Sequence, residues 1–174
     1  TNSFSYKNLS FSFLVDARIG GEIFSATHVA LQSSGAAAAT APGGQRNDIV
    51  VDGAVLDGSG TPTKNTQSVS QQLYWSAIST ANNLGIGEAY LYDASNIRLR
   101  NVQLGYELPR KVLGKSPIQR ARVTLSCNNV WMIKSHMDGI DPESVFATGS
   151  NAVGFENGAP PTMRSFLFSL TLGF

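Results

Sequence analysis

Four segments of the chain alternate between apolar and polar residues over an unusually long distance. They span residues 6–18, 97–108, 122–134 and 164–174. Successive side chains of a strand point to opposite faces, so a period of two predicts strands with one apolar face. Strands of globular domains cluster near 5–6 residues, whereas about 9–11 residues cross a bilayer at a tilt. The pattern therefore predicts an all-β fold of long antiparallel strands that span a membrane.

The cleanest alternation lies at the C-terminus, where the apolar positions are Phe166, Phe168, Leu170, Leu172 and Phe174. The alternation assigns each strand a lipid-facing side and a side that faces the lumen of a barrel or its plug. We expect the lipid-facing set to include Phe11, Phe13, Leu125, Phe168 and Leu170. We expect the lumen-facing set to include Ser10, Ser12, Asp16, Thr124, Ser126, Ser169 and Thr171.

Segment 97–108 changes phase partway along its length. Ile97 and Leu99 are apolar at odd positions, whereas from Val102 onward the apolar residues occupy even positions. By simple alternation, Arg98 and Arg100 would share a face with Val102. We therefore expect the first third of this segment to lie outside the main apolar band.

The connections differ strongly in length. Residues 109–121 form a compact turn opened by Pro109, whereas 31–96 and 135–163 are long and irregular. Short turns on one side and long loops on the other are typical of outer-membrane barrels, whose long loops are extracellular. In that orientation Tyr106 and Phe174 lie near one membrane rim and Trp131 near the other, as aromatic girdles require.

Composition excludes several other classes. Charged residues are only 14% of the 174 positions, and the net charge of +1 gives no electrostatic basis for binding nucleic acid. The single cysteine, Cys127, excludes an internal disulfide, and two histidines far apart in sequence offer little for a zinc site. No apolar run is long enough for a membrane-spanning helix.

Several short motifs follow one another along the chain: Tyr6–Ser10, Gly20–Phe24, Asp93–Val102, Leu104–Pro109, Asn128–Trp131, Gly139–Glu143 and Pro161–Phe174. Together they resemble the C-terminal portion of SusC/RagA-type TonB-dependent outer-membrane transporters. The resemblance covers nearly the whole chain and is weakest over residues 33–69. Cys127 and Asn128 depart from the residues more usual in the family.

The resemblance implies that residues 1–174 are the C-terminal segment of a receptor barrel of about 22 strands plugged by an N-terminal domain. Four strands cannot close even an eight-stranded barrel, so we interpret the chain as a fragment. The family implies outer-membrane import of oligosaccharides or peptides, with a SusD-type surface lipoprotein. It also implies contact with TonB through the missing N-terminal part. It implies neither enzymatic chemistry nor a cofactor or metal.

Aromatic residues in the first long loop are candidates for substrate binding. These are Tyr74, Trp75, Tyr90 and Tyr92. Aromatic rings can stack on the apolar faces of sugars, but such rings also anchor loops by packing, and we favour packing.

The terminal strand carries a second candidate site. The resemblance implies that Phe166, Phe168, Leu170, Leu172 and Phe174 form the signal that the barrel-assembly machinery reads, because an amphipathic strand offers a free edge for pairing.

Asp141 and Glu143, with Asp138 nearby, suggest either a calcium site or the start of a helix. We favour the helix start, because Asp at an N-cap followed by Pro and Glu is a common opening.

Two other functions remain open at this point. A soluble β-sandwich binding module, such as a carbohydrate-binding domain, would show the same alternation. A glycan hydrolase would need two converging carboxylates, and Asp93, Asp138, Asp141 and Glu143 all lie in loops. No known catalytic motif is present in the sequence.

Overall fold

The computed structural model describes residues 1–80, 85–114, 116–144 and 151–174. The chain divides into two compact units. Unit 1 contains residues 1–22, 93–144 and 159–174, and unit 2 contains residues 23–92 and 145–158. No helix among the described residues has both the length and the apolar character needed to span a membrane.

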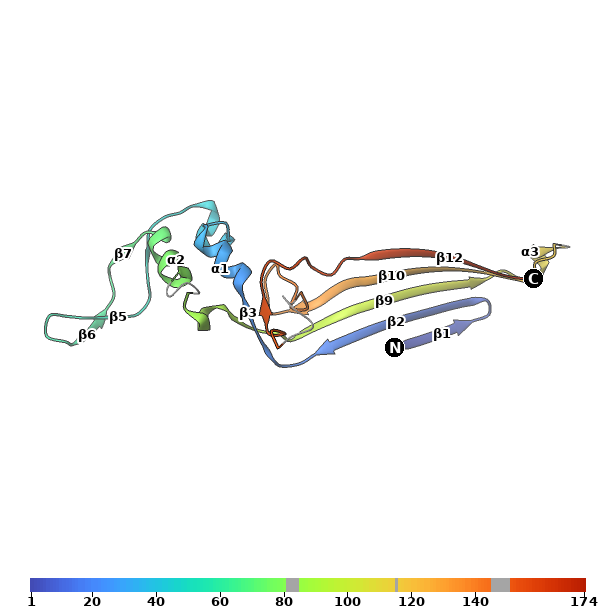
Figure 1. The fold of residues 1–174 in the computed structure, drawn as a ribbon, viewed down its shortest axis with the longest axis horizontal. Helices are drawn as coiled ribbons and strands as arrows, with labels where there is room; N and C mark the ends of the chain where they lie inside the picture. Colours follow the sequence, from blue (N-terminus) through green and yellow to red (C-terminus); the bar gives the residue numbers. More distant parts are fainter. Residues whose placement is uncertain (81–84, 115, 145–150) are drawn as a thin grey trace. The chain divides into compact units, whose positions relative to one another are not determined.

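Unit 1 is built on one five-stranded antiparallel sheet, in the order β1-β2-β9-β10-β12 (Figure 1). Its strands are β1 (Asn2–Tyr6), β2 (Leu9–Arg18), β9 (Asn96–Glu107), β10 (Arg120–Ser135) and β12 (Ser165–Gly173). The strands β2, β9, β10 and β12 lie within or close to the four ranges expected from the alternation. A four-residue helix, α3 (Arg110–Leu113), occupies the short connection between β9 and β10.

The first expected strand begins at Leu9 rather than at residue 6, because a hairpin turn precedes it. Residues 6–18 do not form one strand, because Lys7 and Asn8 make a two-residue turn between β1 and β2. Lys7 adopts a left-handed backbone with φ of 52°, which lets the chain reverse so that Tyr6 pairs with Leu9. The Asn8 side chain donates a hydrogen bond of 2.8 Å to the Glu107 carbonyl and so holds the turn against β9. The expectation of one continuous strand was therefore wrong at its N-terminal end.

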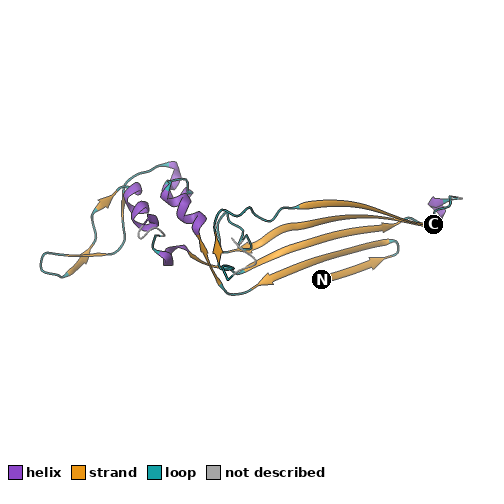
Figure 2. Cartoon of the chain, viewed as in Figure 1, coloured by secondary structure: helices purple, strands orange, loops and turns teal. Residues whose placement is uncertain are grey.

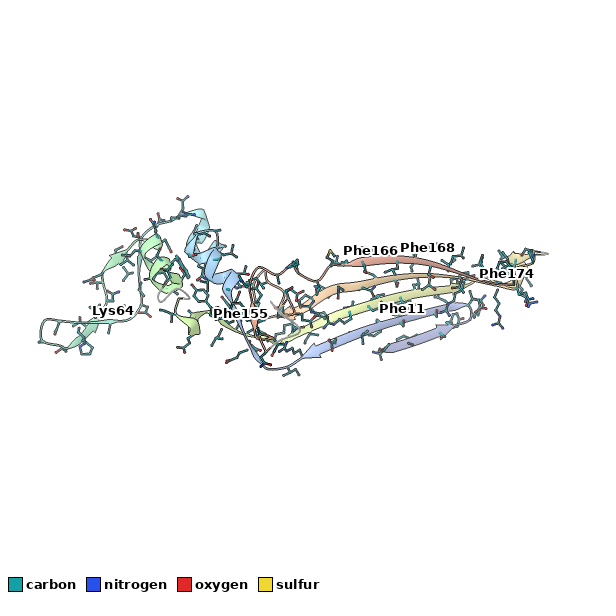
Figure 3. The ribbon with its side chains drawn as sticks, in the orientation of Figure 1. Phe11, Lys64, Phe155, Phe166, Phe168 and Phe174 are labelled. Carbon is teal, nitrogen blue, oxygen red and sulfur yellow. The ribbon has the colours of Figure 1, made fainter. Side chains whose placement is uncertain are left out.

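The register aligns apolar residues in rows across all five strands. One row runs through Phe4, Phe11, Leu104, Leu125 and Phe168. The next row towards the short turn runs through Tyr6, Leu9, Tyr106, Val123 and Leu170. Directly paired residues of an antiparallel sheet share a face. All residues expected on the apolar side therefore do share one face of the sheet. Figure 3 labels three residues of this face, Phe11, Phe166 and Phe168.

The opposite face is polar and carries small side chains. Ser5, Ser10, Gly105, Thr124 and Ser169 form one row across it. Across this row the Arg122 guanidinium donates a hydrogen bond of 2.7 Å to the Ser10 hydroxyl. The Ser10 and Arg122 side chains meet above Gly105. A Cβ at position 105 would lie 2.6 Å from the Ser10 Oγ and 3.0 Å from the Arg122 Nη2. A residue without a side chain is therefore needed at position 105 for this contact.

A β-bulge explains the change of phase in segment 97–108. Asn101 pairs with Leu14, but Leu99 pairs with the next residue, Val15, so Arg100 is an extra residue against β2. The bulge returns Leu99 to the apolar face and places Arg98 opposite Asp16 on the polar face. The expectation that Arg98 and Arg100 share a face with Val102 was therefore wrong, because it assumed an uninterrupted strand.

Unit 2 combines helices with short strands, shown in purple and orange in Figure 2. Its helices are α1 (Ala26–Ser33), α2 (Gln71–Thr80), η1 (Ala38–Thr40), η2 (Pro42–Gly44) and η4 (Gly87–Tyr90). Its strands are β4 (Ile49–Val50), β5 (Ala54–Leu56), β6 (Pro62–Lys64), β7 (Ser68–Val69) and β11 (Phe155–Glu156). Two further strands, β3 (Glu22–Ser25) and β8 (Leu91–Asp93), each have one terminal residue in unit 1.

A buried carboxylate organises the start of α1. Glu156 is 1% exposed and accepts hydrogen bonds of 2.7 Å from the Ser25 hydroxyl and 2.5 Å from the Thr27 hydroxyl. Ser25 also caps α1, because its hydroxyl accepts the backbone N–H of His28 at 3.2 Å. One serine therefore joins the helix start to a strand 131 residues further along the chain.

Candidate functional site

The apolar face of the unit 1 sheet leaves large side chains uncovered. Phe4, Leu125, Phe166 and Phe168 are 58%, 52%, 78% and 68% exposed. A water-soluble domain buries such a row in its core, and a contiguous exposed apolar surface of this kind marks a binding or membrane surface. With small polar residues on the other face, this is the arrangement found in the wall of an outer-membrane barrel.

The terminal strand β12 contains the residues predicted to form an assembly signal, except Phe174. It lies at one edge of the sheet and pairs with β10 from Ser165 to Gly173. Leu170 and Leu172 are 52% and 40% exposed and lie on the apolar face with Phe166 and Phe168. Phe174 follows the strand and is 77% exposed. Among the described residues, β12 therefore presents an apolar face and pairs with a neighbouring strand on one side.

A cluster of mostly charged residues lies on the polar face near the start of β9. Arg98 forms a salt bridge with Asp141, and the two side chains are only 6% and 7% exposed. Arg98 Nη1 also donates a hydrogen bond of 2.9 Å to the Thr162 hydroxyl. Arg100 pairs with Glu143 and donates a second hydrogen bond of 2.8 Å to Asp16. We call these six residues the arginine cluster, and it fastens segments near residues 141 and 162 to the sheet.

Asp141 is the centre of the arginine cluster. Its carboxylate accepts the backbone N–H of Glu143 at 2.9 Å and that of Thr162 at 3.0 Å. Burial alone would raise the pKa of Asp141, but hydrogen bonds from Arg98 and Thr162 outweigh burial and lower the pKa to about 2. The group is therefore a fixed anion that joins two parts of a loop to β9.

The helix expected to begin at Asp141 is not seen in the described residues. Residues 142 and 143 form a turn, and any continuation would fall on 145–150, outside the described residues. The Asp141 carboxylate accepts a hydrogen bond from the Glu143 backbone N–H, as a helix cap would, but its main partner is Arg98. Within the described ranges there is no group of three or more His, Cys, Asp or Glu residues placed to hold a metal ion.

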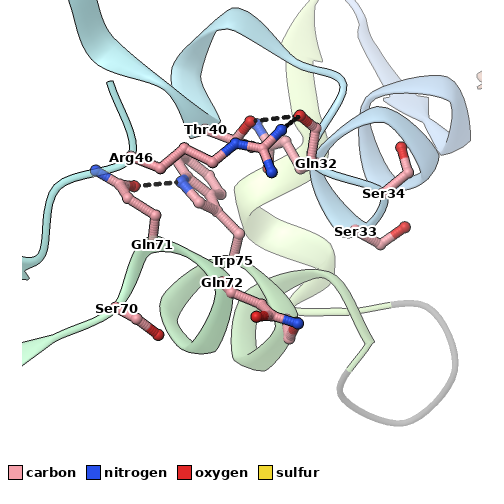
Figure 4. Close-up of a pocket in the computed structure, with 11 residues that line it drawn as sticks. Gln32, Ser33, Ser34, Thr40, Arg46, Ser70, Gln71, Gln72 and Trp75 are labelled. Atoms are coloured by element: carbon pink, nitrogen blue, oxygen red, sulfur yellow. Dashed lines mark hydrogen bonds between the residues drawn. The ribbon is translucent and has the colours of Figure 1, made fainter. Parts of the chain in front are cut away.

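Unit 2 contains a polar pocket of about 360 Å³ (Figure 4). We call it the Trp75 pocket; its described lining consists of Gln32, Ser33, Ser34, Gly35, Thr40, Arg46, Ser70, Gln71, Gln72, Trp75 and Ser76. Small-molecule sites commonly have volumes of about 300–1,000 Å³. The described lining contains one cation and no carboxylate, so the pocket is suited to a polar ligand.

The four aromatic candidates lie in different surroundings. Trp75 lines the pocket and donates a hydrogen bond of 2.9 Å from Nε1 to the Gln71 side chain. Tyr74 packs edge-on against Trp75, with ring centroids 5.0 Å apart. Tyr90 is 0% exposed, and its hydroxyl donates a hydrogen bond of 2.7 Å to Gln32. Tyr92 packs against His28 at 4.7 Å between ring centroids.

Tyr90 is therefore a buried residue that holds the pocket residue Gln32 in place, and its ring is not exposed to a ligand. Burial raises the pKa of Tyr90, and the nearby Tyr92 and Tyr74 raise it further, so the hydroxyl remains a proton donor at neutral pH. Only Trp75 of the four candidates lines the pocket.

Sequence reasoning did not select Arg46 or Gln32 as pocket residues, and it did not predict that Arg98 and Arg100 pair with Asp141 and Glu143. The Gly-rich stretch before Arg46 carries no periodic signal, and the partners of Arg98 are 43 and 64 residues away. Two arginines inside a membrane-type strand were the available signal, because such charges are rare unless paired.

Comparison with known proteins was made by family model, by sequence and by structure. No protein-family model matches the chain. TonB-dependent receptor P3 of Formosa agariphila is 30% identical over 178 residues, which cover 99% of this chain and 16% of the receptor. TonB-dependent receptor P26 of the same organism is 29% identical over 177 residues, again 99% of this chain and 16% of the receptor. The chain thus spans about one sixth of these relatives.

Solved structures show the same fold. The RagAB peptide transporter matches with a TM-score of 0.56 and 19% identity, over 98% of this chain and 16% of that one. The RagAB peptide importer in its closed-closed state matches with a TM-score of 0.58 at the same identity and coverage. The sequence matches confirm the predicted resemblance to TonB-dependent receptors, and the structural matches show that the chain shares its fold with part of the RagAB transporter. The relatives are named as receptors and transporters, not as enzymes.

Proposed function

We propose that this chain forms part of the barrel wall of an outer-membrane TonB-dependent nutrient importer, at its C-terminal end. The observation that carries the proposal is the pair of sheet faces, with apolar rows such as Phe11, Leu104 and Phe168 on one side and serines on the other. Lipid would cover the apolar face, and the polar face would line the lumen or contact the plug. The whole-chain similarity to TonB-dependent receptors supports the same role.

The importer would take up oligosaccharides or peptides together with a SusD-type surface lipoprotein. The RagAB structures are described as a peptide transporter and a peptide importer, which supports peptides as one candidate substrate. The lipoprotein partner is implied by the resemblance to SusC/RagA-type transporters. TonB would act through the N-terminal part that this chain does not include. We assign the chain itself no chemical step on the substrate.

The terminal strand would also direct assembly of the barrel. β12 exposes Phe166 and Phe168 on its apolar face and has one free edge. The assembly machinery would pair with that edge before the barrel closes. Deleting Phe174 from the full-length receptor should lower its amount in the outer membrane, whereas replacing Ser169 by Ala should not. Equal amounts for both variants and the wild type would contradict a signalling role.

The two alternatives receive less support. A β-sandwich requires a second sheet packed on the first, whereas unit 1, in its described residues, contains one sheet only. A hydrolase would need two free carboxylates, whereas Asp141 and Glu143 are both paired with arginines. The similarity to receptors over the whole chain also favours transport.

The test of the proposed function uses the full-length protein. It should be recovered from the outer-membrane fraction, migrate faster in a gel when unboiled, and bring a surface lipoprotein with it on purification. Uptake of its nutrient should cease when tonB is deleted. A soluble protein whose migration is insensitive to boiling would overturn the proposal and favour a stand-alone binding module.

A further inference from the structure

The Trp75 pocket includes one cation, Arg46, with which no described carboxylate pairs. Arg46 Nη2 donates a hydrogen bond of 2.9 Å to the Gly35 carbonyl, which also accepts the Thr40 hydroxyl at 2.9 Å. Gly35 has φ of +73°, and a Cβ there would lie 3.3 Å from Arg46 Nη2. No described carboxylate forms an ion pair with Arg46, so its remaining N–H groups are available to a ligand.

Two amides of the pocket are also held in position. Gln32 accepts the hydroxyl of the buried Tyr90 at 2.7 Å, and Gln71 accepts the Trp75 indole N–H at 2.9 Å. Each amide uses its oxygen in this bond, which leaves its NH₂ group as a donor. Gln71 is only 4% exposed, so its orientation is well fixed. The pocket therefore presents preorganised donors, which lowers the entropic cost of binding.

The composition of the lining indicates the class of ligand. Besides Arg46 and Trp75, the described lining contains three glutamines, four serines, one threonine and one glycine. Such groups match the hydroxyls of a sugar, and an indole face can pack against the apolar face of a sugar ring. Trp75 is the single large apolar side chain in the described lining, so apolar peptide side chains would find little contact there.

We propose that the Trp75 pocket binds a uronic acid unit of an acidic oligosaccharide. Arg46 would pair with the ring carboxylate, Trp75 would pack against the ring, and the amides of Gln32 and Gln71 would bind hydroxyls. The inference rests on the proposed import function and names the substrate class for it.

The test measures binding of short oligosaccharides to the full-length receptor purified with its lipoprotein. The probes are oligomers of glucuronate, galacturonate, mannuronate and guluronate, each paired with its carboxyl-reduced neutral form, and a tetraglutamate peptide. Isothermal titration should show that at least one acidic oligomer binds more tightly than its neutral form. Arg46→Gln should weaken that binding about ten- to a hundredfold and leave the neutral form unchanged, since a charge-assisted contact is lost.

Lys64→Gln is the matched control, because Lys64 is an exposed cation of the same unit outside the pocket. It should leave all affinities unchanged. The proposal is overturned if no acidic oligomer binds more tightly than its neutral form, if Arg46→Gln has no effect, or if only tetraglutamate depends on Arg46. If the receptor in that case still supports TonB-dependent uptake and still copurifies with its lipoprotein, the import function stands and only the substrate assignment is wrong.

Discussion

The two units of the chain are stabilised in different ways. In unit 1, residues such as Phe11 and Leu104 are placed by pairing between neighbouring strands, and the same alternation repeats along every long strand. In unit 2, the start of α1 depends on Glu156, which lies 131 residues from its partner Ser25. The repeating pattern of unit 1 can be recognised in the sequence, whereas the start of α1 in unit 2 depends on a contact between residues that are far apart in the sequence.

The arginine cluster is where unit 1 departs from its own pattern. A bulge at Arg100 interrupts β9. Asp141 neutralises the charge of Arg98, and Asp16 and Glu143 neutralise that of Arg100. The cluster therefore gives the simple sheet a specific, buried polar contact of the kind that otherwise characterises unit 2.

Breaking the buried salt bridge should have the largest effect. Arg98→Ala leaves the Asp141 carboxylate buried without its main partner, which costs about 3–5 kcal/mol in comparable pairs. Urea unfolding of the full-length receptor in lipid vesicles should show this loss. Asp16→Asn removes a partner that is 52% exposed and should cost much less, because water screens the charges of an exposed pair. Equal losses for both variants would contradict the importance of burial.

Acid should weaken the same contact. The folded-state pKa of Asp141 is lowered to about 2, below the usual value of about 3.9 in an unfolded chain. Its stabilising contribution is therefore fully present above about pH 5 and is lost as the pH falls through about 4 towards 2. Asp141→Asn should lower stability at pH 7 and flatten the fall in stability over this acid range. This linkage would be contradicted if the free energies of unfolding of the wild type and the variant differed by the same amount from pH 7 to pH 2.

Arginine substitutions on the two faces of β12 should show which face contacts lipid and which faces the lumen. Leu170→Arg puts a cation on the apolar face and should destabilise the receptor by about 2–4 kcal/mol near mid-bilayer. Ser169→Arg puts the same charge on the polar face opposite Thr124 and should be tolerated. It is a better control than Thr171→Arg, because Thr171 lies opposite Arg122. Equal destabilisation in lipid vesicles would contradict the assignment of the faces.

Gly105 tests the close contact on the polar face. Gly105→Ala forces the Ser10 and Arg122 side chains apart and should cost about 1–3 kcal/mol by overpacking. Gly173→Ala is the control, because its nearest neighbour, the Arg120 Cβ, lies at an ordinary contact distance of 3.5 Å. The same unfolding measurement should rank the two variants in this order, and the reverse ranking would contradict the geometry.

The smallest expected effect tests unit 2. Ser25→Ala removes the cap of α1 and one of the donors to Glu156, and should cost about 0.5–2 kcal/mol. Hydrogen exchange should show faster exchange at the start of α1 without a change in β9. Thr80→Ala, at the exposed end of α2, should leave the exchange of α1 unchanged. Uniformly faster exchange in both units would indicate that Ser25 does not act locally.

The sequence predicted the long strands and their two faces because alternation is a local signal. It missed the β1–β2 hairpin because the turn at Lys7 and Asn8 contains neither glycine nor proline, so the alternation seemed to continue through it. It misassigned Arg98 because a bulge is not visible in a binary pattern. The resemblance supplied the family, which alternation alone did not separate from a sandwich.

The candidate sites were less predictable than the strands. Trp75 was selected from sequence, and it does line a pocket. Arg46 was not, because its place in the pocket depends on the carbonyl of Gly35 in a low-complexity stretch. Tyr90 was named as a binding candidate, but the structure buries it behind Gln32. Burial and hydrogen bonding between segments distant in sequence were needed to separate these roles.

The central claim is that β12 belongs to a barrel wall with one face in lipid. The most direct measurement attaches a spin label to a single cysteine at position 168 or 169 of the full-length receptor in lipid bilayers, with Cys127 and any other cysteine replaced by serine. The label at Phe168 should be accessible to oxygen dissolved in the lipid, and the label at Ser169 to a water-soluble nickel complex. Equal accessibility at both positions, or the reverse, would contradict the account.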